Sequence, residues 1–157
     1  MSLLLVVKTL HILSSTVLFG AGIGTAFQML ATHHQGDVHA IAATTRRVVL
    51  ADRLMTTPAA ILQPLSGLLL AYLRGWPWSA SWLVTSMALY VVAIVCWLAV
   101  VGLQNEMASE AGEADQSGSP LSPLYHADFR DWVQLGCPAF FAFIAIYWLM
   151  LTRPVLW

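Results

Sequence analysis

Long apolar stretches separated by polar segments dominate the chain. Four stretches are long and predominantly apolar: residues 3–31, 48–73, 82–103 and 132–152. About 20 apolar residues in an α-helix are enough to cross the hydrocarbon core of a bilayer. A helix also satisfies its own backbone polar groups, as lipid requires. The pattern therefore predicts an all-α protein, a four-transmembrane-helix bundle that forms one integral membrane domain, residues 1–157.

The segments between these stretches have the composition of loops. "THHQGDVHAIAATTRR" is polar with one glycine, "RGWPWSAS" contains glycine, proline and tryptophan, and the third segment is acidic and rich in serine and glycine. We expect the third loop to be partly mobile over residues 109–122. Four spans place both termini on one side of the bilayer. The distribution of lysine and arginine slightly favours an orientation with the termini outside the cytoplasm.

The second span contains a charged residue and two prolines. Asp52 lies near its start, and Pro58 and Pro64 each remove a backbone donor. We therefore expect a kinked second helix. Asp52, Thr56 and Gln63 have the spacing i, i+4 and i+11, which puts them on one helical face. That face should look into the bundle.

Composition strengthens the membrane assignment and removes other classes. The 157 residues are 59% hydrophobic and 10% charged, with a mean hydropathy of +0.73, outside the usual range of soluble domains. The net charge is −1 and no basic patch occurs, so nucleic acid is not an expected partner. Cys96 and Cys137 lack CxxC spacing, which argues against a disulfide framework. The first apolar run has no preceding positive charge, so we expect no cleaved signal peptide.

The first span has a polar face. Lys8, His11 and Ser15, at i, i+3 and i+7, share it. An ionisable residue at membrane depth is a candidate functional residue. Lys8 is close enough to the helix end to reach water, whereas His11 is deeper and is either a hydrogen-bonded structural residue or a ligand. Gly20 and Gly24 form a GxxxG pair, which lets another helix or a flat macrocycle come close.

Further polar residues gather on the side of the first and third loops. Three histidines and an aspartate there fit a solvated loop and, less well, a zinc or copper site. Arginines on the same side could pair with Asp52 and Asp131 in a charge network. No nucleophile elbow, Walker loop or zincin motif occurs, so catalysis of the soluble type is not expected. The residues of the possible metal site are His33, His34, Asp37 and His39.

Three segments resemble a known family: "VKTLHILSSTVLFGAGIGTAF", "RRVVLADRLMTTPAAILQPLSGLLLAYLRGW" and "FRDWVQLGCPAFFAFIAIYWLMLTRP". They are similar, over nearly the whole chain, to the bacterial integral membrane proteins grouped as domain of unknown function 2269. More distantly, the chain resembles the HemJ-type protoporphyrinogen oxidases, which are four-helix membrane proteins that bind haem b, and the copper-resistance D membrane domain. The shared points are K-x-L-H-I in the first span, M-T-T-P-A-x-I-L followed by Gly67 and G-W in the second, and a proline near the end of the fourth.

The distant resemblance implies a haem b site. His11 matches the first-span histidine that is an axial ligand in HemJ-type proteins, which makes His11 the expected metal ligand and Lys8 its neighbour. The third span has no His, Lys or Arg, unlike HemJ-type proteins. The iron would therefore be five-coordinate, or Met55, Met87 or a loop histidine would supply the sixth ligand.

The propionates of such a haem would need cationic partners. Arg46, Arg47 or Arg53 could meet them, since arginine pairs bidentately with carboxylates. The sequence as a whole favours a small haem b-binding protein of redox or electron-transfer type in the bacterial inner membrane, with a quinone or a membrane redox protein as partner. If it is an enzyme, a membrane oxidoreductase of the HemJ type is expected.

Two other functions remain open from the sequence. A transporter or metal-handling protein would use the polar face of the broken second span as a pathway. A cofactor-free accessory subunit would use the GxxxG face of the first span to bind a larger partner or a second copy, giving a homo-oligomer.

Overall fold

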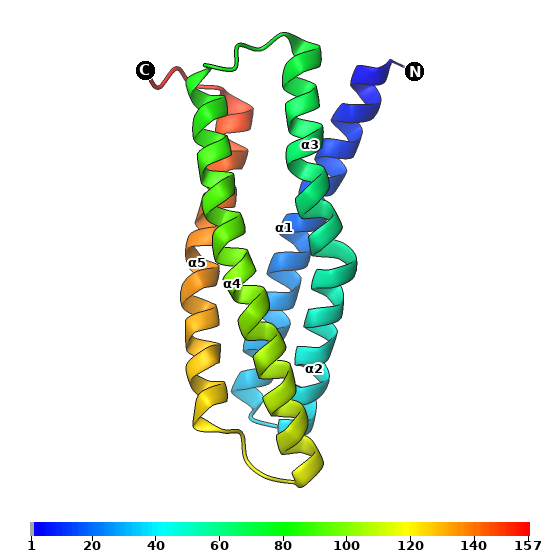
Figure 1. Ribbon diagram of the computed structural model, residues 1–157, viewed down its shortest axis with the longest axis vertical. Helices are drawn as coiled ribbons and strands as arrows, with labels where there is room; N and C mark the ends of the chain where they lie inside the picture. Colours follow the sequence, from blue (N-terminus) through cyan, green and yellow to red (C-terminus); the bar gives the residue numbers. More distant parts are fainter. Residues whose placement is uncertain (1) are drawn as a thin grey trace.

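The structure is a computed structural model that describes residues 2–157. In these residues every regular element is helical and no strand occurs. α2, η1 and α3 follow one another without a break, so this part of the chain has four helices long and apolar enough to cross a membrane. The predicted all-α, four-span bundle is confirmed (Figure 1). The elements are α1 (Leu3–Gln35), α2 (Val38–Ala51), the π-helical turn η1 (Asp52–Thr56), α3 (Thr57–Arg74), α4 (Ser81–Ser117) and α5 (Pro123–Thr152).

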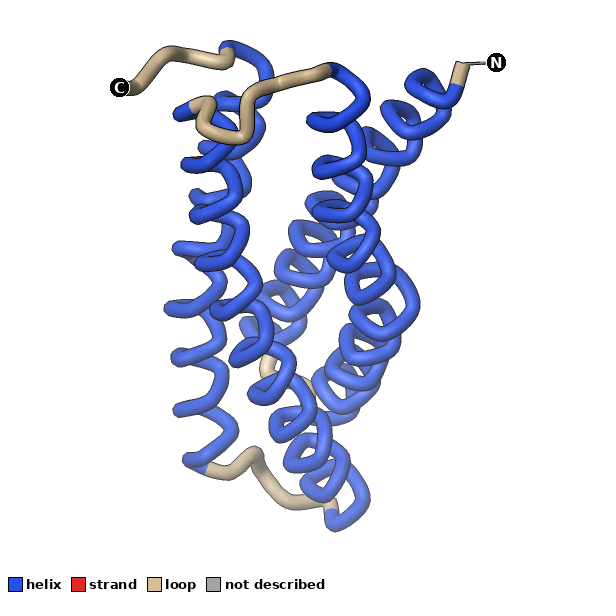
Figure 2. The backbone as a smooth tube through the Cα atoms, turned by 45° about the horizontal axis from the view of Figure 1, so that its top comes forward, coloured by secondary structure: helices blue, strands red, loops and turns tan. Residues whose placement is uncertain are grey.

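The four spans form two helical hairpins. α1 packs against α2 and α3, and α4 packs against α5. α2 also packs against α4, at the end of the bundle that holds the α1–α2 and α4–α5 connections. Figure 2 shows the α1–α3 pair and the α4–α5 pair as separate arms toward the other end. The start of α1 and the C-terminus both lie at that other end, as four alternating spans require.

Aromatic side chains bridge the two hairpins. The Tyr147 hydroxyl donates to the Ser15 carbonyl at 3.0 Å, and the rings of Phe19 and Phe140 stack with centroids 5.6 Å apart. Buried apolar clusters fill the bundle near both ends, and a smaller cluster around Leu18 lies between them. The bundle has two cavities, one on each side of this middle cluster.

Helices extend into the segments that we predict as the first and third loops. The first predicted loop is largely helical, because α2 begins directly after a two-residue turn. α4 continues to Ser117 and α5 begins at Pro123, so the third connection comprises residues 118–122 rather than all of 104–131, and most of the segment 109–122 is helical. Both extensions are amphipathic helices whose polar composition masks a periodic buried face. The buried positions include Ile41, Thr45 and Val48 in α2, and Met107, Ala111 and Ala114 in α4.

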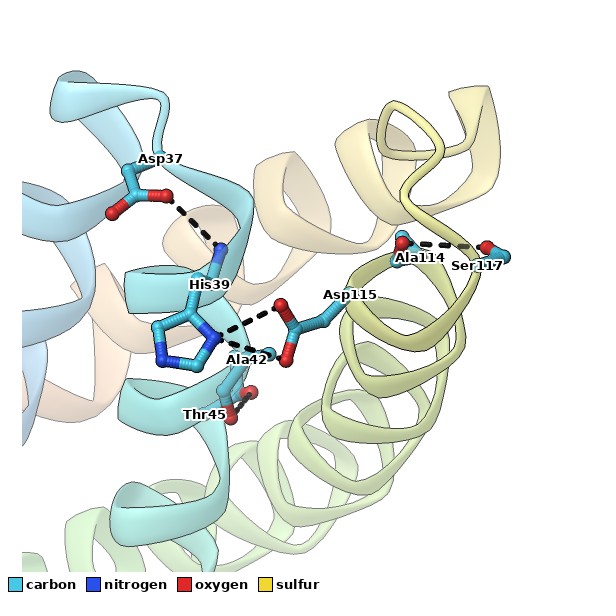
Figure 3. Close-up of polar contacts among 7 residues, drawn as sticks. All are labelled: Asp37, His39, Ala42, Thr45, Ala114, Asp115 and Ser117. Carbon is cyan, nitrogen blue, oxygen red and sulfur yellow. Dashed lines mark hydrogen bonds and ion pairs between the residues drawn. The ribbon is translucent and has the colours of Figure 1, made fainter.

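The turn between α1 and α2 is held by its own residues. Gly36 has a φ of 73°, a left-handed conformation that favours glycine at a helix C-terminus. Asp37 caps α2 by accepting the backbone N–H of His39 at 3.1 Å (Figure 3). His39 Nδ1 lies 3.0 and 3.2 Å from the two Asp115 carboxylate oxygens, so this pair joins α2 to α4.

The irregularity in the second span is a π-helical turn. η1 ends just before Pro58, which has no N–H to continue an α-helical ladder. The Thr57 hydroxyl and backbone N–H both donate to the Asp52 carbonyl, which closes the widened turn. Pro64 lies inside the regular helix α3. The kink that we predict for this helix is not shown by the structure.

Candidate functional site

The larger cavity lies between the two hairpins toward the end of the bundle that holds the termini. We call it the terminal cavity. Its volume is about 670 Å³, and residues of α1, α3, α4 and α5 line it. Its wall is predominantly apolar, with a few polar and charged side chains that come from three helices and the segment after α5. Those side chains include Lys8, His11, Ser15, Gln63, Arg74 and Arg153.

The contacts of His11 favour the tautomer that has its proton on Nδ1. Nδ1 lies 2.9 Å from Ser66 Oγ. The Ser66 hydroxyl lies 2.7 Å from the Leu62 carbonyl and 3.1 Å from the Gln63 carbonyl, and when it donates to one of them it can accept from a protonated Nδ1. Nε2 of the neutral ring is then unprotonated and free to accept. The Gln63 amide nitrogen lies 3.3 Å from Nε2, a long contact.

The Gln63 side chain, which contacts His11 Nε2, is itself held in place. The Ser14 hydroxyl donates to Gln63 Oε1, which turns the amide nitrogen toward His11. Gly67 lies against the ring of His11 and leaves the space that the ring occupies. His11 is thus an oriented imidazole at the wall of a mainly apolar cavity, with a basic nitrogen whose only partner is a weak donor.

Three cationic side chains line the same cavity: Lys8, Arg74 and Arg153. The guanidinium of Arg153 lies 4.4 Å from the ring centroid of Trp76, a cation–π geometry. Among residues 2–157 none of these cations forms an ion pair, since the salt bridge found there joins His39 to Asp115. The cavity can therefore receive an anionic group.

The structure brings together only two of the expected site residues. Lys8 and His11 line the terminal cavity, whereas four others are exposed and line neither cavity. One of them, Arg53, donates a hydrogen bond of 3.4 Å to Asn105. Arg46, Arg47 and Arg53 are on the connection side of the bundle, and His11 is on the terminal side, so topology separates them. The four residues outside the cavities are Arg46, Arg47, Arg53 and Met55.

Sequence reasoning missed Ser66, Gly67, Arg74 and Arg153. Arg74 and Arg153 end the second and fourth spans, and both are therefore on the same side as Lys8 in any four-span topology. That placement was a usable signal. Ser66 carried none, because a contact between residues 55 positions apart depends on how α1 and α3 pack.

The second cavity, of about 510 Å³, lies on the other side of Leu18, and we call it the Asp52 cavity. Asp52 is 6% exposed, and its Oδ1 accepts the Thr56 hydroxyl at 2.7 Å. With its amide turned to satisfy both neighbours, Gln104 donates to Asp52 Oδ2 at 2.6 Å and accepts from Trp132 Nε1 at 3.3 Å. Side chains from η1 and α4 thus hold one buried carboxyl group, and Trp132 of α5 orients one of them.

Two expectations about Asp52 need correction. Asp52 and Thr56 line the Asp52 cavity, but Gln63 lines the terminal cavity. Gln63 lies about two helical turns, or about 10 Å, beyond Thr56 toward the terminal end, and therefore reaches the cavity on the other side of the Leu18 cluster. The arginine pairs expected for Asp52 and Asp131 are also not formed within residues 2–157.

The structure does not gather the residues of the possible metal site at one point. His33 and His34 lie in the last turn of α1, and His33 stacks on Phe129 with ring centroids 3.6 Å apart. His39 faces Asp115 on α4 instead. Residues 2–157 contain no group of three or more His, Cys, Asp or Glu side chains able to hold a metal ion.

Comparison with known proteins gives one match. The model of a family described as "Predicted integral membrane protein (DUF2269)" matches residues 5–154, and so includes all four spans. No curated protein and no solved structure matches the chain. These comparisons do not confirm the more distant resemblance to HemJ-type oxidases or to the copper-resistance D domain.

Proposed function

This chain belongs to the DUF2269 family of integral membrane proteins, and we propose that it binds haem b in the terminal cavity, where Nε2 of His11 would hold the iron. The observation that supports this most is the hydrogen bond from His11 Nδ1 to Ser66 Oγ. Histidines that ligate metals usually donate their other N–H to a neighbour, which fixes the tautomer and the ring. Ser66 gives His11 that arrangement.

The cavity suits the size and polarity of the ligand. Its volume of about 670 Å³ falls within the range of about 300–1,000 Å³ that ligand pockets usually have. The macrocycle is apolar and its two propionates are anionic. Lys8 lies about one helical turn from His11, and Arg74 about two turns from Gly67, both toward the terminal end. The cavity therefore offers apolar walls around the imidazole and cations at one edge.

The proposal changes the residues assigned to the haem. Lys8, Arg74 and Arg153 replace the arginines of the connection side as partners of the propionates, since they line the cavity. Met87 of α4 also lines the cavity, on the hairpin opposite His11, and its thioether would be a second group able to hold the haem.

Haem bound in this way would supply one-electron exchange within the membrane. The chain's own residues would orient the imidazole through Ser66, exclude water with the apolar walls and offset the propionate charge. We propose a multi-pass electron-transfer protein of the bacterial inner membrane. The transport alternative has less support, because Gln63 does not share a cavity with Asp52 and Thr56.

The test is the pigment of the purified protein. The chain is expressed with ample haem supply, purified in detergent, and its absorption is recorded oxidised and reduced, together with haem content per chain. We expect haem in the wild type and little in His11→Ala. His34→Ala is the matched control, since His34 is exposed on the same helix and should leave the spectrum unchanged. A monodisperse, folded and colourless wild type would contradict the proposal and favour the cofactor-free accessory subunit.

A further inference from the structure

The Asp52 cavity opens toward lipid. Of the residues that line it, Phe27 and Phe141 are 71% and 65% exposed, and both belong to membrane-spanning helices. The rest of the wall is mainly aliphatic and aromatic, with Thr25 and Cys137 in addition. Its polar end is where Gln104, Thr56 and Trp97 surround Asp52. A ligand that reaches this end must therefore be lipid-soluble and polar only at its head.

The polar end of the cavity has both an acceptor and a donor that are not fully used in hydrogen bonds. The Asp52 carboxyl accepts from Thr56 and Gln104, but a carboxylate has about four acceptor sites. Trp97 Nε1 is buried close to Asp52, and no hydrogen bond of normal length and angle engages it. Among residues 2–157 no cation forms an ion pair with Asp52. The site thus suits a head group that donates to a carboxylate and accepts from an indole N–H.

We propose that the Asp52 cavity binds a membrane quinone in its quinol form, with a ring hydroxyl donated to Asp52 and a ring oxygen accepting from Trp97. A quinol has hydroxyl groups that both donate and accept, a flat apolar ring, and a tail that belongs in lipid. Fatty acids and anionic phospholipids fit less well, because their ionised head groups offer only acceptor oxygens and cannot donate to the Asp52 carboxyl. The aromatic wall formed by stacked Phe19 and Phe140 suits a flat ring.

A quinol in this cavity would be the redox partner of the proposed haem. Its role as a redox partner therefore rests on the proposed function. Leu18 and Phe143 line both cavities, so the two ligands would lie on opposite sides of the same side chains. Binding of the quinol itself does not require haem. A binding measurement can therefore fail for either ligand without failing for the other.

The experiment titrates decyl-benzoquinol, kept reduced under anaerobic conditions, into the detergent-purified full chain by isothermal calorimetry. We expect saturable binding by the wild type and by His11→Ala, since His11 lines only the other cavity. Asp52→Asn should weaken binding about tenfold, as expected for loss of one hydrogen bond to a carboxyl oxygen. Trp97→Phe, which keeps a ring and removes the donor, should weaken it by a smaller factor.

A cavity-filling pair controls for loss of folding. Gly22 lines the cavity and Gly24 does not, and an added Cβ meets no atom within 4 Å at either position. Gly22→Leu should abolish binding, and Gly24→Leu should leave it unchanged. No saturable binding by a monodisperse wild type would overturn the proposal. So would equal binding by wild type, Asp52→Asn and Gly22→Leu, or displacement of the quinol by decanol at equal affinity, which would indicate a site for simple alcohols.

Discussion

Gly67 of α3 lies directly against the imidazole of His11 on α1. A Cβ placed on Gly67 would come within 3.1 Å of His11 Cε1, closer than side chains normally pack. The residue next to Gly67, Ser66, accepts the hydrogen bond from His11 Nδ1 at 2.9 Å. One turn of α3 therefore sets both the position and the protonated nitrogen of the imidazole, and these two properties decide whether Nε2 can serve as a ligand.

Gly67→Ala should displace the His11 ring. The added methyl group needs the ring to shift by a few tenths of an ångström, which lengthens its bond to Ser66. We expect lower haem content and a shifted Soret band in the purified variant. Gly20→Ala is the control, because a Cβ there meets no atom within 4 Å, and it should be neutral or stabilising by up to about 1 kcal/mol. Equal spectra for Gly67→Ala and the wild type would argue against His11 as ligand.

Ser66→Ala should leave His11 Nδ1 without its acceptor while keeping the helix intact. Loss of such a supporting contact typically lowers metal affinity by about 10- to 100-fold, and we expect a comparable fall in haem affinity, measured by transfer of haem to apomyoglobin. Ser86→Ala removes a hydroxyl that bonds only to the Trp82 carbonyl in the same cavity. If Ser66→Ala and Ser86→Ala lose haem equally, the loss results from a general change of the cavity and not from the hydrogen bond between Ser66 and His11.

Charge at the terminal end should matter and charge at the connection end should not. Arg74→Gln and Arg153→Gln should each weaken haem retention about two- to fivefold, as partly exposed ion pairs do. Arg46→Gln and Arg47→Gln should have no effect, because those side chains are exposed outside both cavities. Haem retention is followed by gel filtration at rising ionic strength. If Arg46→Gln and Arg47→Gln weaken haem retention more than Arg74→Gln and Arg153→Gln do, the propionates lie on the connection side.

Thr56→Val should destabilise the bundle. It removes the hydrogen bond of 2.7 Å to Asp52 Oδ1 and leaves a buried acceptor unpaired, which costs about 1–3 kcal/mol. Unfolding is measured by titration with dodecyl sulfate in mixed micelles. In the control Thr16→Val, the exposed hydroxyl that is lost bonds only to the Ile12 carbonyl, and little change is expected. A Thr56→Val variant as stable as the wild type would show that the Asp52 carboxyl is reached by water.

The spans could be read from the sequence because a bilayer imposes about 20 apolar residues per helix. The helical segments outside the apolar stretches could not be predicted in this way. After residue 103, for example, only the buried positions Met107 and Ala111 distinguish α4 from a polar loop. The sequence alone identified His11 as an ionisable residue at membrane depth. Its partners were not identified, because the contacts with Ser66 and Gly67 arise from the packing of α1 against α3.

The most direct measurement is chemical rescue of a His11→Gly variant with free imidazole. The small side chain leaves a space beside Gly67, and an added imidazole can enter it and offer a nitrogen to the iron. The account predicts that the purified variant, supplied with haem, shows an altered or absent Soret band that returns toward the wild-type spectrum as imidazole is added. A spectrum for His11→Gly that equals that of the wild type before any imidazole is added would contradict ligation by His11.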